Sequence, residues 1–157
     1  MRLRETAVTS PDAVRLLTEY FESRELGFPT NQGAYKVTFP PPEHFVPPAG
    51  VFVVIDSDEG VPVGCGGIRR IAASELGLVR YEVKHVWVEP EYRGHGWAAA
   101  LMADLEARAS AFGADEVVLD TNASLEAAAR LYARSGYRPI EPYNDNPNAT
   151  NWYAKTL

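Results

Sequence analysis

The chain has 157 residues, of which 46% are hydrophobic and 23% are charged, a balance typical of globular rather than disordered proteins. No apolar run reaches the ~18 residues of a membrane-spanning helix, and the first residues lack the apolar core of a signal peptide. The net charge of −6 argues against general nucleic-acid binding, and the single cysteine, Cys65, excludes an internal disulfide and a cysteine-based zinc site.

These properties predict a single domain over residues 1–157, located in the cytoplasm, with no membrane or nucleic-acid partner and no metal. An acidic surface weakly favours cationic substrates such as amines, although solubility explains the net charge more readily. Composition therefore excludes several classes of protein, and the motifs have to indicate the function.

The N-terminal part predicts a short strand, Arg2 to Thr6, followed by a helix that ends near Arg24. Ser10 is a good N-cap, and Pro11 suits the first helical position. Residues that recur at helical spacing predict the apolar face of this helix, and they are Val14, Leu17, Tyr20 and Phe21.

Residues 27–50 contain six prolines, which rule out a long regular element. A long irregular stretch inside a compact domain is often functional, for instance as a loop on the substrate side. A passive surface connection explains the same residues equally well, so both interpretations stay open.

The remaining elements alternate between strands and helices. Residues 51–55 and 61–71 predict a hairpin, because residues 56–60 have a turn-forming composition. The later pattern predicts, in order, a strand (79–88), a helix (96–112), a strand (116–119), a helix (125–134) and two strands (137–140 and 152–157). This order is that of an α/β protein with a mixed sheet.

The most informative segment is residues 86–98, where a strand is followed by a glycine-bearing turn and then directly by a helix. Such a turn directs unpaired backbone N–H groups and the positive end of the helix dipole at one point, which makes an anion site suited to phosphate. Gly94 and Gly96 would let a ligand approach the backbone. Two nucleotide motifs fit poorly, since no Lys–Ser/Thr pair follows Gly96 and Ala99 stands where a dinucleotide-binding motif has its third glycine.

Residues 93–98 resemble the Arg/Gln-x-x-Gly-x-Gly/Ala signature of the GNAT acyltransferase superfamily, which binds the pyrophosphate of acetyl-CoA. Residues 86–92 are similar to the strand and lead-in of that family. The chain also resembles the second cofactor segment of the family, at Asn122, Leu131-Tyr132 and Gly136-Tyr137. Ala98 stands where glycine is commoner, and Trp97 replaces a typical aliphatic residue. The order of elements agrees with the family along nearly the whole chain.

The resemblance implies a mixed, mostly antiparallel central sheet, splayed between its fourth and fifth strands and flanked by helices, with acetyl-CoA in the cleft. The fourth strand would pair with the pantetheine amides like an added strand, and the turn would hold the pyrophosphate. Asn122 would hydrogen-bond the pantetheine arm. The cofactor-binding residues that the resemblance implies are Val86, Trp87, Val88, Arg93, Gly94, His95, Gly96, Trp97, Ala98 and Asn122.

Tyr132 is the predicted general acid. Acyl transfer to an amine needs a neutral amine, a stabilised oxyanion and a proton for the departing thiolate. The resemblance implies that the phenol of Tyr132 reaches the coenzyme sulfur, whereas the alternative interpretation is an aromatic residue on the core face of its helix. Cys65 lies in a glycine-rich strand and is predicted to be a small buried residue rather than a nucleophile.

Glu82 is the predicted general base, because the resemblance implies a glutamate here that activates the amine directly or through water. Alternation puts Glu82 on the same face of its strand as Val86 and Val88, unless a bulge changes the parity. Two alternatives stay open. Glu82 could be an exposed residue paired with a neighbouring cation, and His85 could be the base, since imidazole titrates in the useful range.

The resemblance implies an N-acetyltransferase that moves the acetyl group of acetyl-CoA to a primary amine of a small molecule or peptide, by direct attack in a ternary complex. The alternative is a non-catalytic acyl-CoA-binding or sensing module on the same fold. Residues 143–148 resemble an acceptor-side loop of some bacterial members, although turn formation explains them equally well. The resemblance also favours a homodimer, while the acceptor, the acyl group and the oligomeric state stay open.

Overall fold

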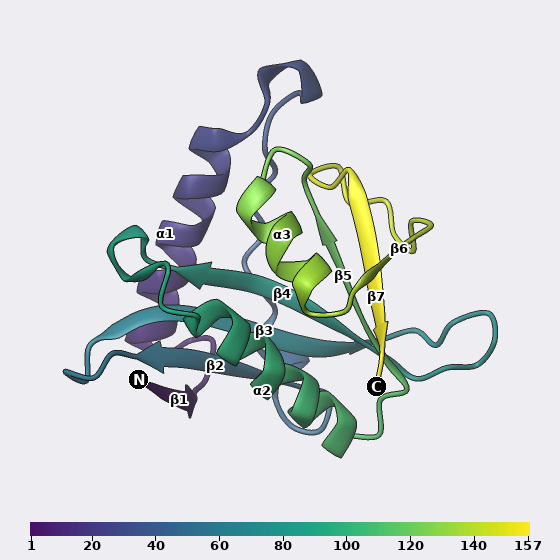
Figure 1. The fold of residues 1–157 in the computed structure, drawn as a ribbon, viewed down its shortest axis with the longest axis horizontal. Helices are drawn as coiled ribbons and strands as arrows, with labels where there is room; N and C mark the ends of the chain where they lie inside the picture. Colours follow the sequence, from purple (N-terminus) through teal and green to yellow (C-terminus); the bar gives the residue numbers. More distant parts are fainter.

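The computed structural model describes all residues, 1–157, and contains one seven-stranded sheet with the strand order β1-β2-β3-β4-β5-β7-β6 (Figure 1). Every neighbouring pair of strands is antiparallel except β4–β5, which is parallel. The elements are β1 (Arg2–Glu5), α1 (Pro11–Gly27), η1 (Thr30–Gln32), η2 (Pro42–Phe45), β2 (Gly50–Asp56), β3 (Pro62–Ile71), β4 (Arg80–Val88), η3 (Pro90–Tyr92), α2 (Trp97–Ala111), β5 (Glu116–Thr121), α3 (Glu126–Arg134), β6 (Arg138–Ile140) and β7 (Asn151–Thr156). The predicted mixed α/β sheet is confirmed.

Helix α1 begins as its sequence predicts and ends later. The hydroxyl of Ser10 accepts a hydrogen bond from the Ala13 N–H at 3.3 Å, which caps the first turn. The helix continues past Arg24 to Gly27. Its buried residues are Ala13, Leu16, Leu17 and Phe21, whereas Val14 is 42% exposed. Val14 was therefore wrongly placed in the apolar stripe, because it lies at the edge of the buried arc of the helix.

The two faces of the sheet carry separate apolar clusters. On one face, side chains of α1 and of η2 pack against β2 and β3, with Trp87 of β4 among them. On the other face, α2 and Tyr132 of α3 pack against β2 to β5. The candidate site lies between these layers, where β4 meets β5. No helix combines the length and the apolar character that crossing a membrane requires.

Strands β4 and β5 are paired only at one end. Three residue pairs join them, from Arg80–Glu116 to Glu82–Val118, although β4 continues to Val88 and β5 to Thr121. Figure 1 shows the two strands diverging from this short ladder. The expected splay between the fourth and fifth strands is confirmed, and beyond Glu82 this edge of β4 has no partner strand.

A bulge at His85 changes which side chains of β4 share a face. Between the pairs Gly67–Lys84 and Cys65–Trp87, β4 has one residue more than β3, and His85 has a φ of +58°, the only positive value at a non-glycine residue. Val86 and Val88 consequently pack in the cluster on the α2 side, together with the two neighbours of Glu82 in the strand. The expectation that Glu82 shares a face with Val86 and Val88 was wrong, because the bulge reverses the alternation.

Candidate active site

The turn between β4 and α2 presents free backbone N–H groups. Gly94 and Gly96 have φ values of +84° and +77°, which side chains with a Cβ rarely adopt. No side chain caps α2, and the first hydrogen bond of the helix joins the Ala100 N–H to the carbonyl of Gly96 at 3.0 Å. The N–H groups of residues 97–99 therefore have no partner within the helix, as an anion site requires.

Side chains around this turn hold it to the end of β4. Arg93 Nε donates to the carbonyl of Val88 at 2.8 Å, and its guanidinium lies 4.8 Å from the centre of the Trp87 ring. Tyr92 stacks on Trp97 at 5.8 Å, and the ring of His95 lies 5.4 Å from that of Trp97. The aromatic residue that replaces an aliphatic one at position 97 thus packs on the turn itself.

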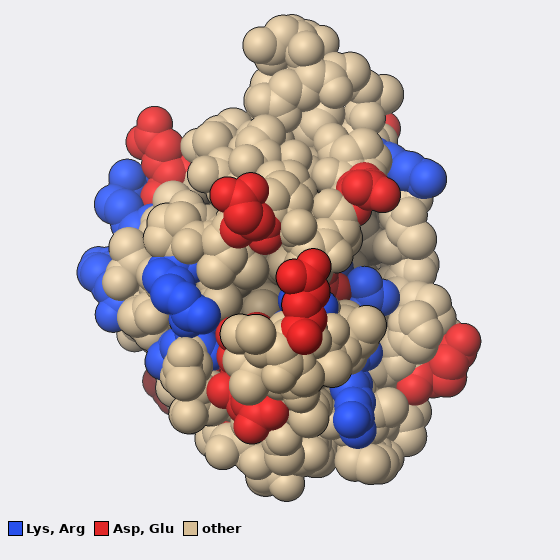
Figure 2. All heavy atoms as spheres, turned by 90° about the vertical axis from the view of Figure 1, so that its right-hand side faces the viewer, with Lys and Arg blue, Asp and Glu red and all other residues tan.

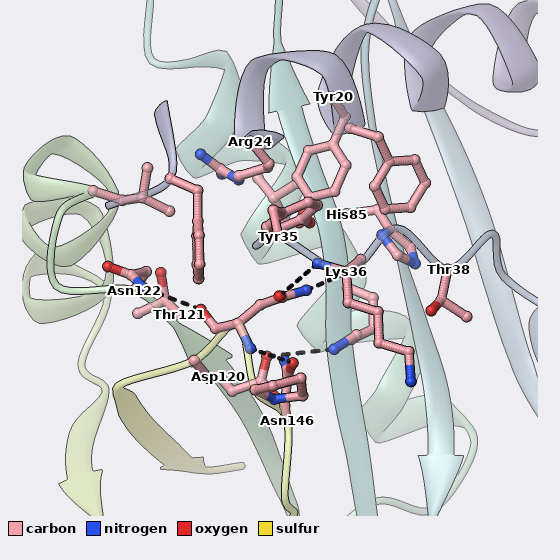
Figure 3. A pocket seen from close by; sticks show the side chains of 18 of the residues that line it. Tyr20, Arg24, Tyr35, Lys36, Thr38, His85, Asp120, Thr121, Asn122 and Asn146 are labelled. Carbon is pink, nitrogen blue, oxygen red and sulfur yellow. Dashed lines mark hydrogen bonds and ion pairs between the residues drawn. The ribbon is translucent and has the colours of Figure 1, made fainter. Parts of the chain in front are cut away.

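A cavity of about 380 Å³ opens where β4 and β5 part (Figure 3). Its walls come from α1, from β3 and β4, from the end of β5, from α3 and from two loops, residues 35–41 and 144–149. The proline-rich stretch is therefore a wall of the cavity, which favours its interpretation as a substrate-side loop. The 143–148 loop lies at the same cavity. Neither loop could be assigned to it from sequence spacing.

Tyr132 lines this cavity from α3. The side chain is only 7% exposed, and its ring lies 5.9 Å from Tyr137 and 6.1 Å from Tyr153. The hydroxyl makes no hydrogen bond to the protein, so its proton is free for a ligand. Burial raises the pKa of Tyr132 to about 12. The phenol is therefore protonated at neutral pH, as a proton donor must be.

Glu82 is 1% exposed and does not line the cavity. Its Oε1 accepts from Nε and Nη2 of Arg69 at 3.0 and 2.8 Å, and its Oε2 accepts from the Tyr143 hydroxyl at 2.7 Å. Both carboxylate oxygens are thus occupied. The interpretation of Glu82 as an exposed strand residue was wrong, and its role as a base stays a prediction.

Asp120 is the acidic group that reaches the cavity, and sequence reasoning missed it. It lies in β5, where Nζ of Lys84 is 3.3 Å from Oδ1 and the amide of Asn144 donates to Oδ2 at 2.7 Å. Asn144 Nδ2 is also 3.4 Å from Glu82 Oε2, so the two carboxylates share one network. The only signal for Asp120 in the sequence was its position as a polar residue near the end of the strand that parts from β4.

His85 contributes a neutral imidazole to the cavity wall. Its ring packs against Tyr20, Phe21 and Phe45 at 5.5, 5.5 and 6.2 Å, and its Nδ1 is buried without a hydrogen-bond partner. Burial, together with the charges of Lys84 and Arg69, lowers the pKa of His85 to about 3. An imidazole this weakly basic is a poor general base at neutral pH.

We expect His85 to make the chain less stable as the pH falls from 6.5 towards 3. In this range the unfolded chain binds a proton at His85 that the folded chain excludes, so the free energy of unfolding falls by up to about 1.4 kcal/mol per pH unit from this group. Urea unfolding at several pH values, compared between the wild type and His85→Asn, measures this contribution. Asparagine tolerates positive φ and retains the bulge. An identical pH dependence in both proteins would contradict the expectation.

Comparison with known proteins agrees with this geometry. Residues 12–137, from α1 to the residue after Gly136, match the model of the acetyltransferase (GNAT) family. The chain belongs to the GNAT family. An uncharacterized N-acetyltransferase of Schizosaccharomyces pombe is 31% identical over 107 residues, which cover 68% of this chain and 63% of that relative, so the match spans less than two thirds of its length.

Solved structures share the GNAT fold over nearly the whole chain. A protein of Klebsiella pneumoniae that is named as an acyl-CoA N-acyltransferase is 27% identical, with a TM-score of 0.75 over 99% of this chain and 97% of that one. A chain of the NatC complex, solved with Gag peptide and CoA, is 18% identical and has a TM-score of 0.70 over 100% and 99% of the two chains. The expected family is thereby confirmed.

Asn122 is tied into the GNAT cleft by its own chain. Its Nδ2 donates to Gln32 Oε1 at 2.7 Å and to the carbonyl of Asn148 at 3.1 Å, while its Oδ1 accepts from the Ser124 N–H at 3.0 Å. It joins η1 to the 144–149 loop of the cavity wall. Its contact with pantetheine stays a prediction.

Cys65 is fully buried in β3, and burial raises the pKa of its thiol. The prediction of a small buried residue is confirmed.

On the face shown in Figure 2, lysines and arginines are interspersed with acidic residues rather than gathered into one basic patch.

Proposed function

We propose that this GNAT protein transfers the acetyl group of acetyl-CoA to a primary amine of a small molecule or peptide, by direct attack within a ternary complex. The observation that carries the proposal is the parting of β4 and β5 after Glu82. It opens a cavity with the unpaired hydroxyl of Tyr132 in its wall, and the edge of β4 that it leaves without a partner runs on towards the phosphate-suited turn. We further propose that residues 1–157 act as one domain.

The cofactor would occupy the cleft from the turn to the cavity. The free N–H groups at the start of α2 would bind the pyrophosphate. The edge of β4 between Val83 and Val88, which has no partner strand, would pair with the pantetheine amides. The NatC complex, which contains a chain of the same fold, was solved with both a peptide and CoA, the two kinds of ligand that a ternary complex needs.

The chemistry forms a C–N bond and breaks the C–S bond of the thioester. The neutral amine attacks the carbonyl carbon, the intermediate collapses, and the hydroxyl of Tyr132 gives its proton to the departing thiolate. No enzyme-bound acetyl group is needed, because both substrates are present together and the single thiol, Cys65, is buried away from the cavity.

Glu82 would take up the amine proton through intermediaries rather than by contact. Its carboxylate does not line the cavity, but Asn144 is within hydrogen-bond distance of both Glu82 and Asp120. A water or a rearranged side chain at Asp120 would complete the route. The low pKa of His85 supports this assignment over a histidine base.

An enzyme and a sensing module make different predictions for CoA release. We expect free CoA to appear at a rate that depends on the added amine and that rises with pH towards the pKa of the amine, because only the neutral amine attacks. Thiol release is measured over a panel of amines, amino acids, peptides and aminoglycoside antibiotics. Tight binding of acetyl-CoA without amine-dependent release from any of them would support the non-catalytic module instead.

A further inference from the structure

The cavity that Tyr132 lines is positively charged, although the chain as a whole carries a net charge of −6. A single carboxylate, that of Asp120, faces it. Four cationic side chains line it, Arg24, Lys36, Arg69 and Lys84. Positive charge remains in excess even when the buried Glu82 behind Arg69 is included. The cavity and the whole surface are therefore opposite in charge.

Two of these cations have no acidic partner. Arg69 is paired with Glu82 at 2.8 Å, and Lys84 with Asp120 at 3.3 Å. Arg24 and Lys36 form no ion pair, and the charge of the half-buried Arg24 lies over the ring of Tyr20 at 5.0 Å. Lys36 is exposed, whereas Arg24 is half-buried and gains more from an anionic partner. Both unpaired charges are thus free for a ligand.

One part of the wall is suited to an apolar body. Five aromatic side chains line the cavity besides Tyr132 and His85, and they are Tyr20, Phe21, Phe28, Tyr35 and Phe39. Figure 3 shows Tyr20 and Tyr35 beside Arg24 and His85. A volume of about 380 Å³ lies in the range of sites for small molecules. The cavity therefore combines apolar walls with unpaired positive charge.

We propose that the acceptor is an amine that also bears a carboxylate on an apolar body, an amino acid with an apolar side chain being the simplest case. Arg24 and Lys36 bind the carboxylate. This inference rests on the proposed acetyl transfer and specifies its substrate class. The net charge favoured a cationic acceptor. The inference favours an acceptor with an acid group instead, because the acceptor meets the positive charge of the cavity rather than the negative charge of the whole surface.

The same cations assist the attack by the amine. Like charges disfavour an ammonium group, so the cationic wall lowers the pKa of the bound acceptor and raises its neutral fraction. This matters because both nearby carboxylates, Glu82 and Asp120, are already paired with cations. The positive charge of the cavity wall would thus both bind the acid group and favour the neutral form of the amine.

Matched pairs of acceptors test the inference. Apolar amino acids and their amides, such as phenylalanine and phenylalaninamide, share a body and an amine and differ in the carboxylate. We expect kcat/KM to be at least about tenfold higher for the acid, since charge-assisted hydrogen bonds are among the strongest. The amide has the more acidic ammonium and would otherwise react faster. Amides that are acetylated as efficiently as their acids would overturn the inference and leave acetyl transfer intact.

Variants of the two cations provide the second arm. In Arg24→Gln and Lys36→Gln the ratio of kcat/KM for the acid over the amide falls by about tenfold or more. Arg2→Gln, which removes an exposed cation from the edge strand β1, keeps the wild-type ratio. The KM of acetyl-CoA is measured in parallel. If the variants raise that KM and leave the ratio unchanged, the cations serve the cofactor and the inference fails.

Binding separates this inference from the proposed function. If no amine releases CoA, acetyl transfer itself fails, and calorimetric titration of the CoA-saturated chain with the same pairs then decides the inference. Tighter binding of the acids supports it. Equal affinity of acids and amides, or no binding of any acid, overturns it.

Discussion

Replacement of Gly96 by glutamate is expected to weaken CoA binding by at least about 100-fold, or 2.7 kcal/mol, in a chain that remains folded. A Cβ at Gly96 meets no atom within 4 Å, so the new side chain extends into open space before α2. There its carboxylate competes for the free N–H groups and repels the pyrophosphate. Calorimetric titration with CoA measures the loss, and circular dichroism verifies the fold.

Two controls separate charge from backbone strain. Gly77→Glu has a similar cost in backbone strain, because Gly77 has a φ of +79° and a Cβ there also meets nothing within 4 Å. Gly77 lies in the loop before β4, away from the turn. Gly96→Ala has the strain without the carboxylate. Both should lose about 1–2 kcal/mol of stability. Gly77→Glu should retain CoA binding, and Gly96→Ala should bind CoA more tightly than Gly96→Glu because it lacks the carboxylate. Unchanged affinity in folded Gly96→Glu would mean that the pyrophosphate lies elsewhere.

Replacement of Tyr132 by phenylalanine is expected to lower kcat by about 10²- to 10⁴-fold, as the loss of a general acid does. The KM of acetyl-CoA should change little, because the proton is needed only as the C–S bond breaks. The hydroxyl makes no hydrogen bond in the folded chain, so its removal leaves no buried group unpaired. Burial raises the pKa of Tyr132 to about 12. A thiolate that departs into the same buried environment would also become more basic, which favours transfer of the proton to it.

Tyr153→Phe is the matched control, since its ring lies 6.1 Å from that of Tyr132 but does not line the cavity. This variant should retain nearly full activity. Steady-state kinetics on both variants decide the role of the phenol. A kcat for Tyr132→Phe within about threefold of the wild type, far from the expected loss, would leave Tyr132 as a core aromatic.

Local sequence determined the elements of the fold, because their signals come from neighbouring residues. The cap at Ser10 and the glycines of the turn act over a few positions, and the structure has both where the sequence predicts them. The end of α1 was less predictable, since no glycine or proline stops the helix at Arg24. The family signature at residues 93–98 and the position of Tyr132 in the cavity were likewise accessible, because the motif and its element order are local.

Only the tertiary structure decided how these elements form a site. The bulge at His85 needs the register between β3 and β4, and it separates Glu82 from the face of Val86. Glu82 is hydrogen-bonded by Arg69 and Tyr143, which lie 13 and 61 positions away from it in the chain. The sequence alone determined a GNAT fold with a phosphate-suited turn. The charge of the cavity depends on side chains from α1, three strands and a loop, and local patterns carry no information on which of them converge.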